Sequence, residues 1–397
     1  MNRKILISGA SIAGPSLAYW LDRYGFEVTI VEKASSLRGG GYAIDIRGTA
    51  RGVVERMGLL PHLRRLHVDT RQITFLDADG TVITSLRPES FTGGAEGLDL
   101  EVRRGDLADR LYGLVKDRVE FVFDDSIATL DDRGDHVEVA FDSGTRRTFD
   151  LVIGADGLHS NTRALAFGPE ERYHRYLGFC FAGFTMPNAF GLDHEGMLWN
   201  VPGRAAVLYA HDPGEPMHGF LTFARDEPPF TAFRTPQAQR DLVASTFPDT
   251  VWEIPRMVTA MRAAEDVFFD VVSQIHMPAW STGRVALVGD AAYATSFMSG
   301  QGSSVSLVGA YVLAGELATH DDHVTAFAAY EKTVRDFVEQ NQALATEGGG
   351  VIAPRTRQRL DARNAMLRTQ TALPSGGEGR AANTALTLPD YGHALES

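Results

Sequence analysis

A glycine-rich turn near the N-terminus constrains the fold of this chain more than any other feature. Residues 9–14 read GASIAG and lie between the apolar run 5–7 and a segment, 15–21, with helical spacing. A strand, a glycine turn and a helix in this order gather free backbone N–H groups at the positive end of a helix dipole, which suits a pyrophosphate. The usual dinucleotide pattern G-x-G-x-x-G has glycine where this chain has Ser11. A dinucleotide site and a chance turn therefore both remain open at this point.

The segment after this helix extends the pattern to a parallel β-α-β unit. Residues 27–32 form an apolar run that ends in Glu32, and a right-handed crossover joins it to the first strand. An acidic side chain at this place accepts hydrogen bonds from an adenosine ribose and disfavours a 2′-phosphate. A surface glutamate is the alternative.

Composition excludes several classes of protein. The 38 Lys and Arg against 51 Asp and Glu give a net charge of −13, which opposes binding to nucleic acid or an anionic membrane. A single cysteine, Cys180, rules out an internal disulfide framework and a cysteine-cluster metal site, and fits the cytoplasm. No apolar run approaches the roughly twenty residues of a membrane span. The sequence HDDH at 320–323 is best read as a solvated turn, so we expect no metal.

The chain divides by pattern into an α/β part and an inserted β part. Alternating runs between 173 and 272 are typical of an antiparallel sheet with one buried face. We expect a discontinuous α/β domain over 1–172 and 273–345, the inserted β domain over 173–272, and a C-terminal helix with a mobile tail over 346–397. The first domain includes a hairpin predicted over 72–86. A helix over 322–345 is expected to end at the glycines 348–350.

Two further segments join an apolar strand to a glycine and an aspartate. They read DLVIGADGLHSNTR at 150–163 and GRVALVGDAA at 283–292, the latter running on to SGQG at 299–302. With the first turn, they resemble the class A flavoprotein monooxygenases, the aromatic hydroxylases related to para-hydroxybenzoate hydroxylase. The likeness is closest to the branch of tetracycline-inactivating monooxygenases and covers about residues 3–345.

This resemblance implies a Rossmann-like FAD-binding domain with a parallel sheet, an inserted antiparallel β-sheet domain for substrate, and C-terminal helices. It implies FAD as cofactor, with Arg103 competing for the role of Arg104. Carried over by position, the cofactor-binding residues are Gly9, Ser11, Gly14, Glu32, Lys33, Asp45, Arg104, Asp156, Asp290, Gly300, Gln301 and Gly302.

The resemblance also implies the reaction. NADPH or NADH acts as a transient co-substrate, and O2 forms a flavin C4a-hydroperoxide that hydroxylates an aromatic or polyketide-like small molecule. The chemistry centres on the flavin, so no catalytic side chain is assigned, although Ser296, Phe297 and Met298 lie in the flavin loop. Candidate pocket residues are Phe181, Trp199, Tyr209, Phe220, Phe223 and Met298, with plain core packing as the alternative. We expect a monomer or homodimer.

The sequence departs from the family pattern around the flavin. Tyr293 stands where the family usually has histidine, Ser296 and Phe297 where it has prolines, and the usual acid is missing from residues 307–310. A proline would fix φ and stiffen the loop, which serine and phenylalanine do not. The alternative function is therefore a non-oxygenating FAD-dependent tailoring oxidoreductase, or a flavin-fold protein with reduced turnover.

Overall fold

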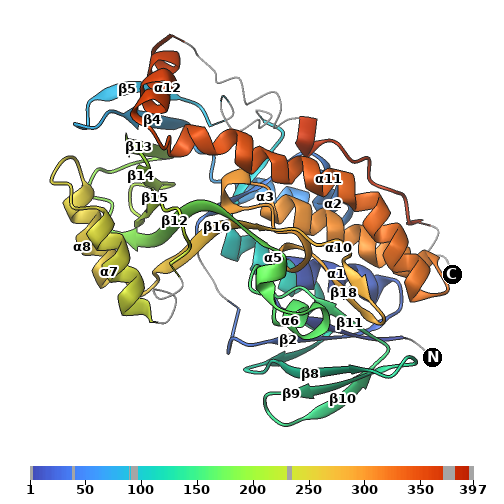
Figure 1. Ribbon diagram of the computed structural model, residues 1–397. Coiled ribbons are helices and arrows are strands. Elements are labelled where there is room, and N and C mark those ends of the chain that lie inside the picture. The colour runs from blue at the N-terminus through green and yellow to red at the C-terminus, as the bar shows by residue number, and fades with distance from the viewer. Residues whose placement is uncertain are drawn as a thin grey trace.

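Two large sheets lie side by side in the computed structural model, with helices packed around both (Figure 1). The structure describes residues 3–37, 41–88, 90, 97–229, 235–369 and 381–392. Among these residues, no helix is both long and apolar enough to cross a membrane.

The first sheet has six strands in the order β17-β18-β11-β1-β2-β7. All its pairs are parallel except the one with the short edge strand β17. Every residue of β11 and β18 is buried, as expected where helices cover both faces of a parallel sheet. This confirms the parallel sheet predicted from sequence. Its strands are β1 (Lys4–Ser8), β2 (Glu27–Glu32), β7 (Glu120–Phe123), β11 (Leu151–Gly154), β17 (Ser281–Thr282) and β18 (Val285–Leu287).

Helices α1 and α10 form the centre of the core beside this sheet and pack on each other. Residues 304–317 of α10 are all buried, because this helix is apolar on every side. The helices of this part are α1 (Ala13–Arg23), α2 (Thr49–Arg56), α3 (Leu60–Arg65), α5 (Arg104–Val115), α6 (Asn161–Phe167), α9 (Asp290–Tyr293), α10 (Gly302–Thr319) and α11 (His323–Ile352). Two small sheets accompany them, β3 (Ala43–Ile46) with β6 (Leu100–Arg103), and β8 (Ile127–Asp132) with β9 (Val137–Phe141) and β10 (Arg146–Phe149).

The second sheet has seven strands in the order β16-β12-β15-β14-β13-β4-β5 and is mostly antiparallel. One face packs on helices α7 (Pro236–Thr246) and α8 (Ile254–Ala263), and the other faces the first domain (Figure 1). Its strands are β4 (Gln72–Leu76), β5 (Val82–Leu86), β12 (His174–Met186), β13 (Glu195–Val201), β14 (Arg204–Ala210), β15 (Met217–Ala224) and β16 (Phe268–Ile275).

The expected domain boundaries change at the hairpin of β4 and β5. The hairpin forms as predicted around residues 77–80, but β4 pairs in parallel with β13 and extends the second sheet. The first domain expected over 1–172 therefore contributes two strands to the second sheet. Local alternation of polar and apolar residues identifies a strand. It does not identify the neighbouring strand, because that pairing joins segments far apart in the sequence.

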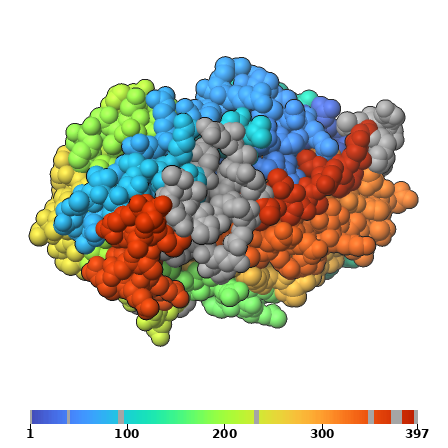
Figure 2. Space-filling view, turned by 90° about the horizontal axis from the view of Figure 1, so that it is seen from above, coloured from blue at the N-terminus to red at the C-terminus, as the bar shows by residue number. Residues whose placement is uncertain are grey.

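The C-terminal region also differs from expectation. Helix α11 continues through the glycines 348–350 to Ile352, and α12 follows at Arg357–Thr369. The expected mobile tail lies partly outside the described residues, but 381–392 pack against the body of the protein. Figure 2 shows this segment in red, lying between the blue N-terminal part and the orange helices. Asn341 Nδ2 donates to Ala382 O at 3.1 Å, and Tyr391 is 5% exposed.

Candidate functional site

The GASIAG turn leaves the carboxyl end of β1 and brings the chain close to β11. Gly9 has φ +106°, and a Cβ there would lie 2.5 Å from Ala155 O. A Cβ on Gly14 would lie 1.9 Å from Gly9 O, so this glycine allows α1 to pack on the turn. No side chain caps the N-terminus of α1. Its first N–H groups are thus available to an anion at the helix end.

Arg104 reaches this turn from the start of α5. Its Nη2 donates a hydrogen bond to Ser11 Oγ at 2.8 Å. The neighbouring Arg103 instead forms an ion pair with Glu215, on the loop before β15. Of the two arginines left open by the sequence, Arg104 is therefore the one that lies at the glycine turn.

Glu32 at the end of β2 holds the turn from its other side. One carboxylate oxygen accepts the Ala10 N–H at 2.8 Å, and the other accepts the Ala34 N–H at 3.0 Å. A carboxylate has about four acceptor positions, so lone pairs remain for a ligand hydroxyl. Lys33 beside it is exposed.

Asp156 caps α6. Its Oδ2 accepts hydrogen bonds from Thr162 N at 2.9 Å and Thr162 Oγ1 at 2.8 Å, and its Oδ1 accepts one from the Ser160 hydroxyl. Ser8 Oγ adds a longer bond at 3.3 Å, which links this cap to β1. Most of the acceptor capacity of Asp156 is thus used within the protein.

Asp290, Asp45 and residues 300–302 meet at the start of α10. A Cβ on Gly302 would lie 3.7 Å from Asp290 Oδ1, and one on Gly300 would lie 3.5 Å from Asp45 Oδ2. The Asp290 side chain keeps some accessible surface, but its position deep among protein atoms raises its pKa, which the charge of Arg104 opposes. Asp45 also pairs with Arg47 at 2.7 Å.

Gln301 lies in the same group and is 1% exposed. Its buried Nε2 has no hydrogen-bond partner among the described residues. A buried donor without a partner is costly, and such groups usually meet a ligand or water.

The proposed pocket residues divide between the two faces of the second sheet. Phe181, Phe220 and Met298 belong to a buried cluster on the face toward the first domain, and Tyr209 packs against it. Trp199 and Phe223 belong to the core beneath α7 and α8 on the opposite face, which agrees with the alternative of plain core packing for these two. Side chains alternate along a strand, so Phe220 and Phe223, three residues apart, cannot share a face.

His211 is a polar residue that the sequence analysis missed. It follows Tyr209 by two residues at the end of β14 and is 6% exposed, and its ring lies 5.2 Å from that of Tyr209. Neither ring nitrogen has a hydrogen-bond partner in the described part of the chain. Burial, aided by the charges of His218 and Arg103, lowers the pKa of His211 to about 3, so the imidazole is neutral at pH 7. No sequence signal marks this histidine, because its burial depends on the pairing of strands.

Comparison with known proteins decides the family. No family model matches the chain. A flavin-dependent monooxygenase of an unidentified prokaryote is 38% identical over 394 residues, 98% of this chain and 99% of the relative. An FAD-dependent monooxygenase of Sarocladium schorii is 31% identical over 378 residues, 89% of each chain. The chain belongs to the flavin-dependent monooxygenases.

A solved structure extends this relationship to the whole fold. The crystal structure of tetracycline destructase Tet(55) matches with a TM-score of 0.85 and 36% identity, over 98% of this chain and 99% of that one. The similarity to this class A flavin-dependent monooxygenase therefore spans both sheets and the C-terminal helices.

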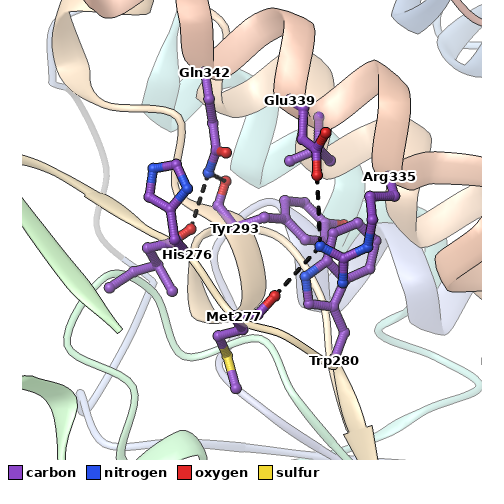
Figure 3. A pocket seen from close by; sticks show the side chains of 9 residues that line it. His276, Met277, Trp280, Tyr293, Arg335, Glu339 and Gln342 are labelled. Carbon is purple, nitrogen blue, oxygen red and sulfur yellow. Dashed lines mark hydrogen bonds and ion pairs between the residues drawn. The ribbon is translucent and has the colours of Figure 1, made fainter. Parts of the chain in front are cut away.

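Tyr293 stands where the resemblance led us to expect histidine, and the surrounding residues accommodate it. It is 2% exposed and accepts a hydrogen bond from Tyr330 Oη at 3.0 Å. Its ring lies 4.5 Å from that of Trp280, which in turn lies beneath the guanidinium of Arg335 at 4.6 Å (Figure 3). A Cβ at position 309 would lie 1.9 Å from Tyr293 Oη, so Gly309 provides the space for the hydroxyl.

Two glutamines hold the chain that leads from Tyr293 to the flavin loop of the family. Gln342 Nε2 donates to Ile275 O at 2.9 Å, and also lies near the carbonyl of Ala294. Figure 3 shows the same amide pointing toward Tyr293, whose carbonyl lies 3.4 Å away. Gln274 Nε2 donates to Thr295 O at 3.1 Å and to Gln342 O at 2.6 Å. These hydrogen bonds tie the backbone carbonyls of residues 293–295 to β16 and α11. The sequence analysis missed these two glutamines, because no sequence pattern marks a glutamine in a helix or strand as a hydrogen-bond donor to a distant loop.

His159 links the two parts of the monooxygenase fold. Its Nδ1 lies 2.8 Å from Glu170 Oε1, and its Nε2 lies 3.3 Å from Asp270 Oδ1 on β16. The hydrogen bonds to Asp270 and Glu170 raise the pKa of His159 to about 10. This histidine therefore joins the loop after β11 to the second sheet as a cation at neutral pH.

Among the described residues, no three His, Cys, Asp or Glu side chains gather as metal ligands would. His320 of the HDDH segment instead lies 3.1 Å from Glu316.

Proposed function

We propose that this chain binds FAD at the carboxyl end of the six-stranded sheet and uses NAD(P)H and O2 to hydroxylate an aromatic or polyketide-like small molecule. The observation that carries the proposal is the contact of Arg104 with Ser11 at the GASIAG turn. It joins a cationic side chain to uncapped helix N–H groups at the sheet edge where dinucleotides bind in open α/β folds. The FAD-dependent relative described above supports the choice of cofactor.

The chain's own residues fit each part of FAD, from the adenosine ribose to the flavin ring. The turn at 9–14 and Arg104 would hold the pyrophosphate, and Glu32 would accept from the adenosine ribose. Asp290 would accept hydrogen bonds from the ribityl chain. Asp45 and residues 300–302 would lie by the flavin ring, where the unpaired Gln301 amide finds a partner. Asp156 is the exception, since its carboxylate accepts hydrogen bonds from Thr162 in the first turn of α6.

Bound FAD would supply the redox chemistry, accepting hydride from NAD(P)H and activating O2 for transfer of one oxygen atom. The protein's part is to orient and to exclude water. The N-terminus of α10 lies at Gly302, and its dipole would stabilise negative charge on the adjoining ring. The apolar cluster with Phe181, Phe220 and Met298 would close the site to solvent.

The second sheet supports an aromatic substrate with a polar group. The face toward the first domain presents Phe181, Phe220 and Tyr209, beside the neutral and unpaired His211. An imidazole in this state can both donate and accept a hydrogen bond, as a phenol or enol requires. The tetracycline destructase described above supports a polyketide-like molecule as the first compound to test.

The experiment compares FAD retention and turnover in Arg104→Met and Arg103→Met. We expect purified wild-type protein to contain FAD, and the Arg104 variant to bind it about 10- to 100-fold more weakly, as loss of a charge-assisted contact predicts. The Arg103 variant should keep FAD, because that side chain pairs with Glu215.

Turnover is measured as NAD(P)H oxidation and O2 uptake with phenols and tetracycline, together with product mass. A gain of one oxygen atom supports hydroxylation. Turnover without any gain of oxygen would reject it in favour of a non-oxygenating oxidoreductase, and a protein unable to take up FAD would reject both.

A further inference from the structure

Phe297 is a partly exposed loop residue whose ring packs among aromatic side chains from other segments. It belongs to the short 3-10 turn Phe297–Ser299 and is 36% exposed. Its ring stacks on Phe181, with centroids 4.4 Å apart and planes 11° apart, and on Phe220 at 5.6 Å and 26°. The edge of Tyr42 faces it at 6.3 Å and 87°. Three aromatic side chains from other segments thus surround this one ring.

Two aromatic side chains of the second sheet form the surface on which the Phe297 ring packs. Phe181 and Phe220 come from the adjacent strands β12 and β15 and lie on the face toward the first domain. The opposite position to Phe220 is Gly183, and a Cβ there would lie 2.9 Å from Phe220 Cε1. Glycine at this position lets the Phe220 ring lie down on the sheet. We call the space on Phe181 and Phe220, bounded by Tyr42, the aromatic slot.

The backbone that places Phe297 in the slot is strained. Ser296 has φ +88° and ψ +147°, close to a region that residues other than glycine almost never adopt. The loop is held in this form by local bonds, among them Ser299 Oγ to Ser296 O at 2.8 Å and Ser299 Oγ to Thr295 Oγ1 at 2.9 Å. Withdrawal of Phe297 from the slot would allow Ser296 to relax.

We propose that the aromatic slot is the binding place for the flat ring of the substrate, and that Phe297 occupies it as a displaceable plug. Phe297 then acts as a specificity-determining residue, because only a molecule that stacks on Phe181 and Phe220 better than phenylalanine displaces it. The ligand class is a planar aromatic system larger than one ring. This inference rests on the proposed function for the identity of the reaction, but the slot itself can be tested without turnover.

Removal of the Phe297 ring changes the apparent dissociation constant of the ligand. The direction of this change shows whether Phe297 blocks the slot as a plug or lines it as a wall. A plug competes with the ligand, so the apparent dissociation constant falls when the plug is removed. A wall contributes contacts to the ligand, so its removal raises that constant. We therefore measure binding of 2-naphthol to FAD-loaded protein by calorimetry for wild type, Phe297→Ala, Phe297→Trp and the control Phe190→Ala. Phe190 is 41% exposed and lies outside the slot.

We expect Phe297→Ala to bind 2-naphthol about tenfold more tightly, the gain produced when a slot open for one-tenth of the time becomes fully open. Phe297→Trp should bind it more weakly, because the larger ring fills the slot better, and Phe190→Ala should match wild type. Weaker binding by the alanine variant, unchanged binding, or no binding by any variant would overturn the plug.

FAD content and NAD(P)H oxidation are recorded on the same samples, so the two proposals fail separately. If the alanine variant loses naphthol affinity while the wild type holds FAD and turns over, the plug is wrong and the monooxygenase assignment stands. If wild type takes up no FAD, the assignment fails. The same titrations on the flavin-free protein then still decide whether Phe297 blocks the slot.

Discussion

Asp156 and Asp290 each follow a strand and a glycine, yet the structure gives them different surroundings. Asp156 accepts hydrogen bonds from Thr162 and Ser160 at the start of α6. Asp290 lies deep beside Gly302, and burial raises its pKa. The same local motif therefore supports the first turn of a helix in one place and offers a candidate ligand contact in the other.

These surroundings predict opposite effects of replacing each aspartate by asparagine. Asp156→Asn should lower the free energy of unfolding by about 1–3 kcal/mol, because buried donors lose their acceptor. Asp290→Asn should leave the stability of the flavin-free protein unchanged or higher, since it removes a carboxylate whose charged form is disfavoured by desolvation, while weakening FAD binding. Urea unfolding of the flavin-free protein and titration with FAD measure the two quantities. A loss of FAD affinity in Asp156→Asn without loss of stability would contradict the cap.

For single residues, the sequence identified candidate residue types better than the face of the sheet on which each side chain lies. Arg104 lies at the glycine turn, and its charge opposes the rise in the pKa of Asp290. Trp199 and Phe223 were placed in the pocket because they are aromatic, but they lie in the core below α7 and α8. A strand pattern shows which residues share a face, but not which face receives the ligand, because that depends on the packing of the whole sheet.

Between elements, α9 and α10 show how two residues on different helices depend on each other. Tyr293 places its hydroxyl where a side chain at position 309 would begin. Gly309 thus belongs with Tyr293, although glycine inside a helix costs about 1 kcal/mol relative to alanine. The sequence contains both residues, but only the contact of the two helices explains the pair.

A double-mutant cycle tests this pairing. Gly309→Ala should destabilise the protein by about 1–3 kcal/mol because of the close contact with Tyr293 Oη. Tyr293→Phe removes that oxygen and the hydrogen bond from Tyr330, which alone costs about 1 kcal/mol. In the double variant the alanine should cost much less, and thermal unfolding of the four proteins measures the difference. Additive effects would show that the hydroxyl does not limit position 309.

The contact of His159 with β16 predicts a pH dependence of stability. The pKa of about 10 in the folded protein lies above the usual value near 6.5, so folding is favoured by the charged form. This contribution is complete below about pH 6.5 and is lost as the pH rises through 10. His159 is half-exposed, so solvent screening limits the effect to about 1 kcal/mol.

We therefore expect His159→Gln to be less stable than wild type at pH 6, with the difference vanishing by pH 10. Urea unfolding between pH 6 and pH 10 measures this difference in stability. The control is His62→Gln, which replaces an exposed histidine on α3. A difference that is constant with pH would assign His159 a packing role in place of a charge.

On the scale of the whole molecule, the C-terminal segment joins elements that are far apart in sequence. Thr49 Oγ1 on α2 donates to Leu386 O at 2.6 Å, and Tyr311 Oη on α10 donates to Pro389 O at 2.7 Å. Figure 2 shows the segment in red between the blue N-terminal part and the orange helices. Its composition predicted mobility, because small and polar residues bury little surface by themselves. Their order comes from partners that only the complete fold assembles.

Tyr391 is the residue by which this segment is anchored, and its replacement tests the anchor. The ring lies over Gly315, where a Cβ would be 2.1 Å from Tyr391 Cδ2, and the hydroxyl donates to Glu316 Oε1 at 2.6 Å. Tyr391→Ala should therefore lower the free energy of unfolding by about 3 kcal/mol, the cost of deleting a buried aromatic side chain. Thr387→Ala, at an exposed position of the same segment, should change it by less than about 0.5 kcal/mol. Limited proteolysis provides a second measurement, since release of the segment exposes its backbone to cleavage. Equal stability and equal protection in the two variants would mean that the segment binds the body of the protein too weakly to support α2 and α10.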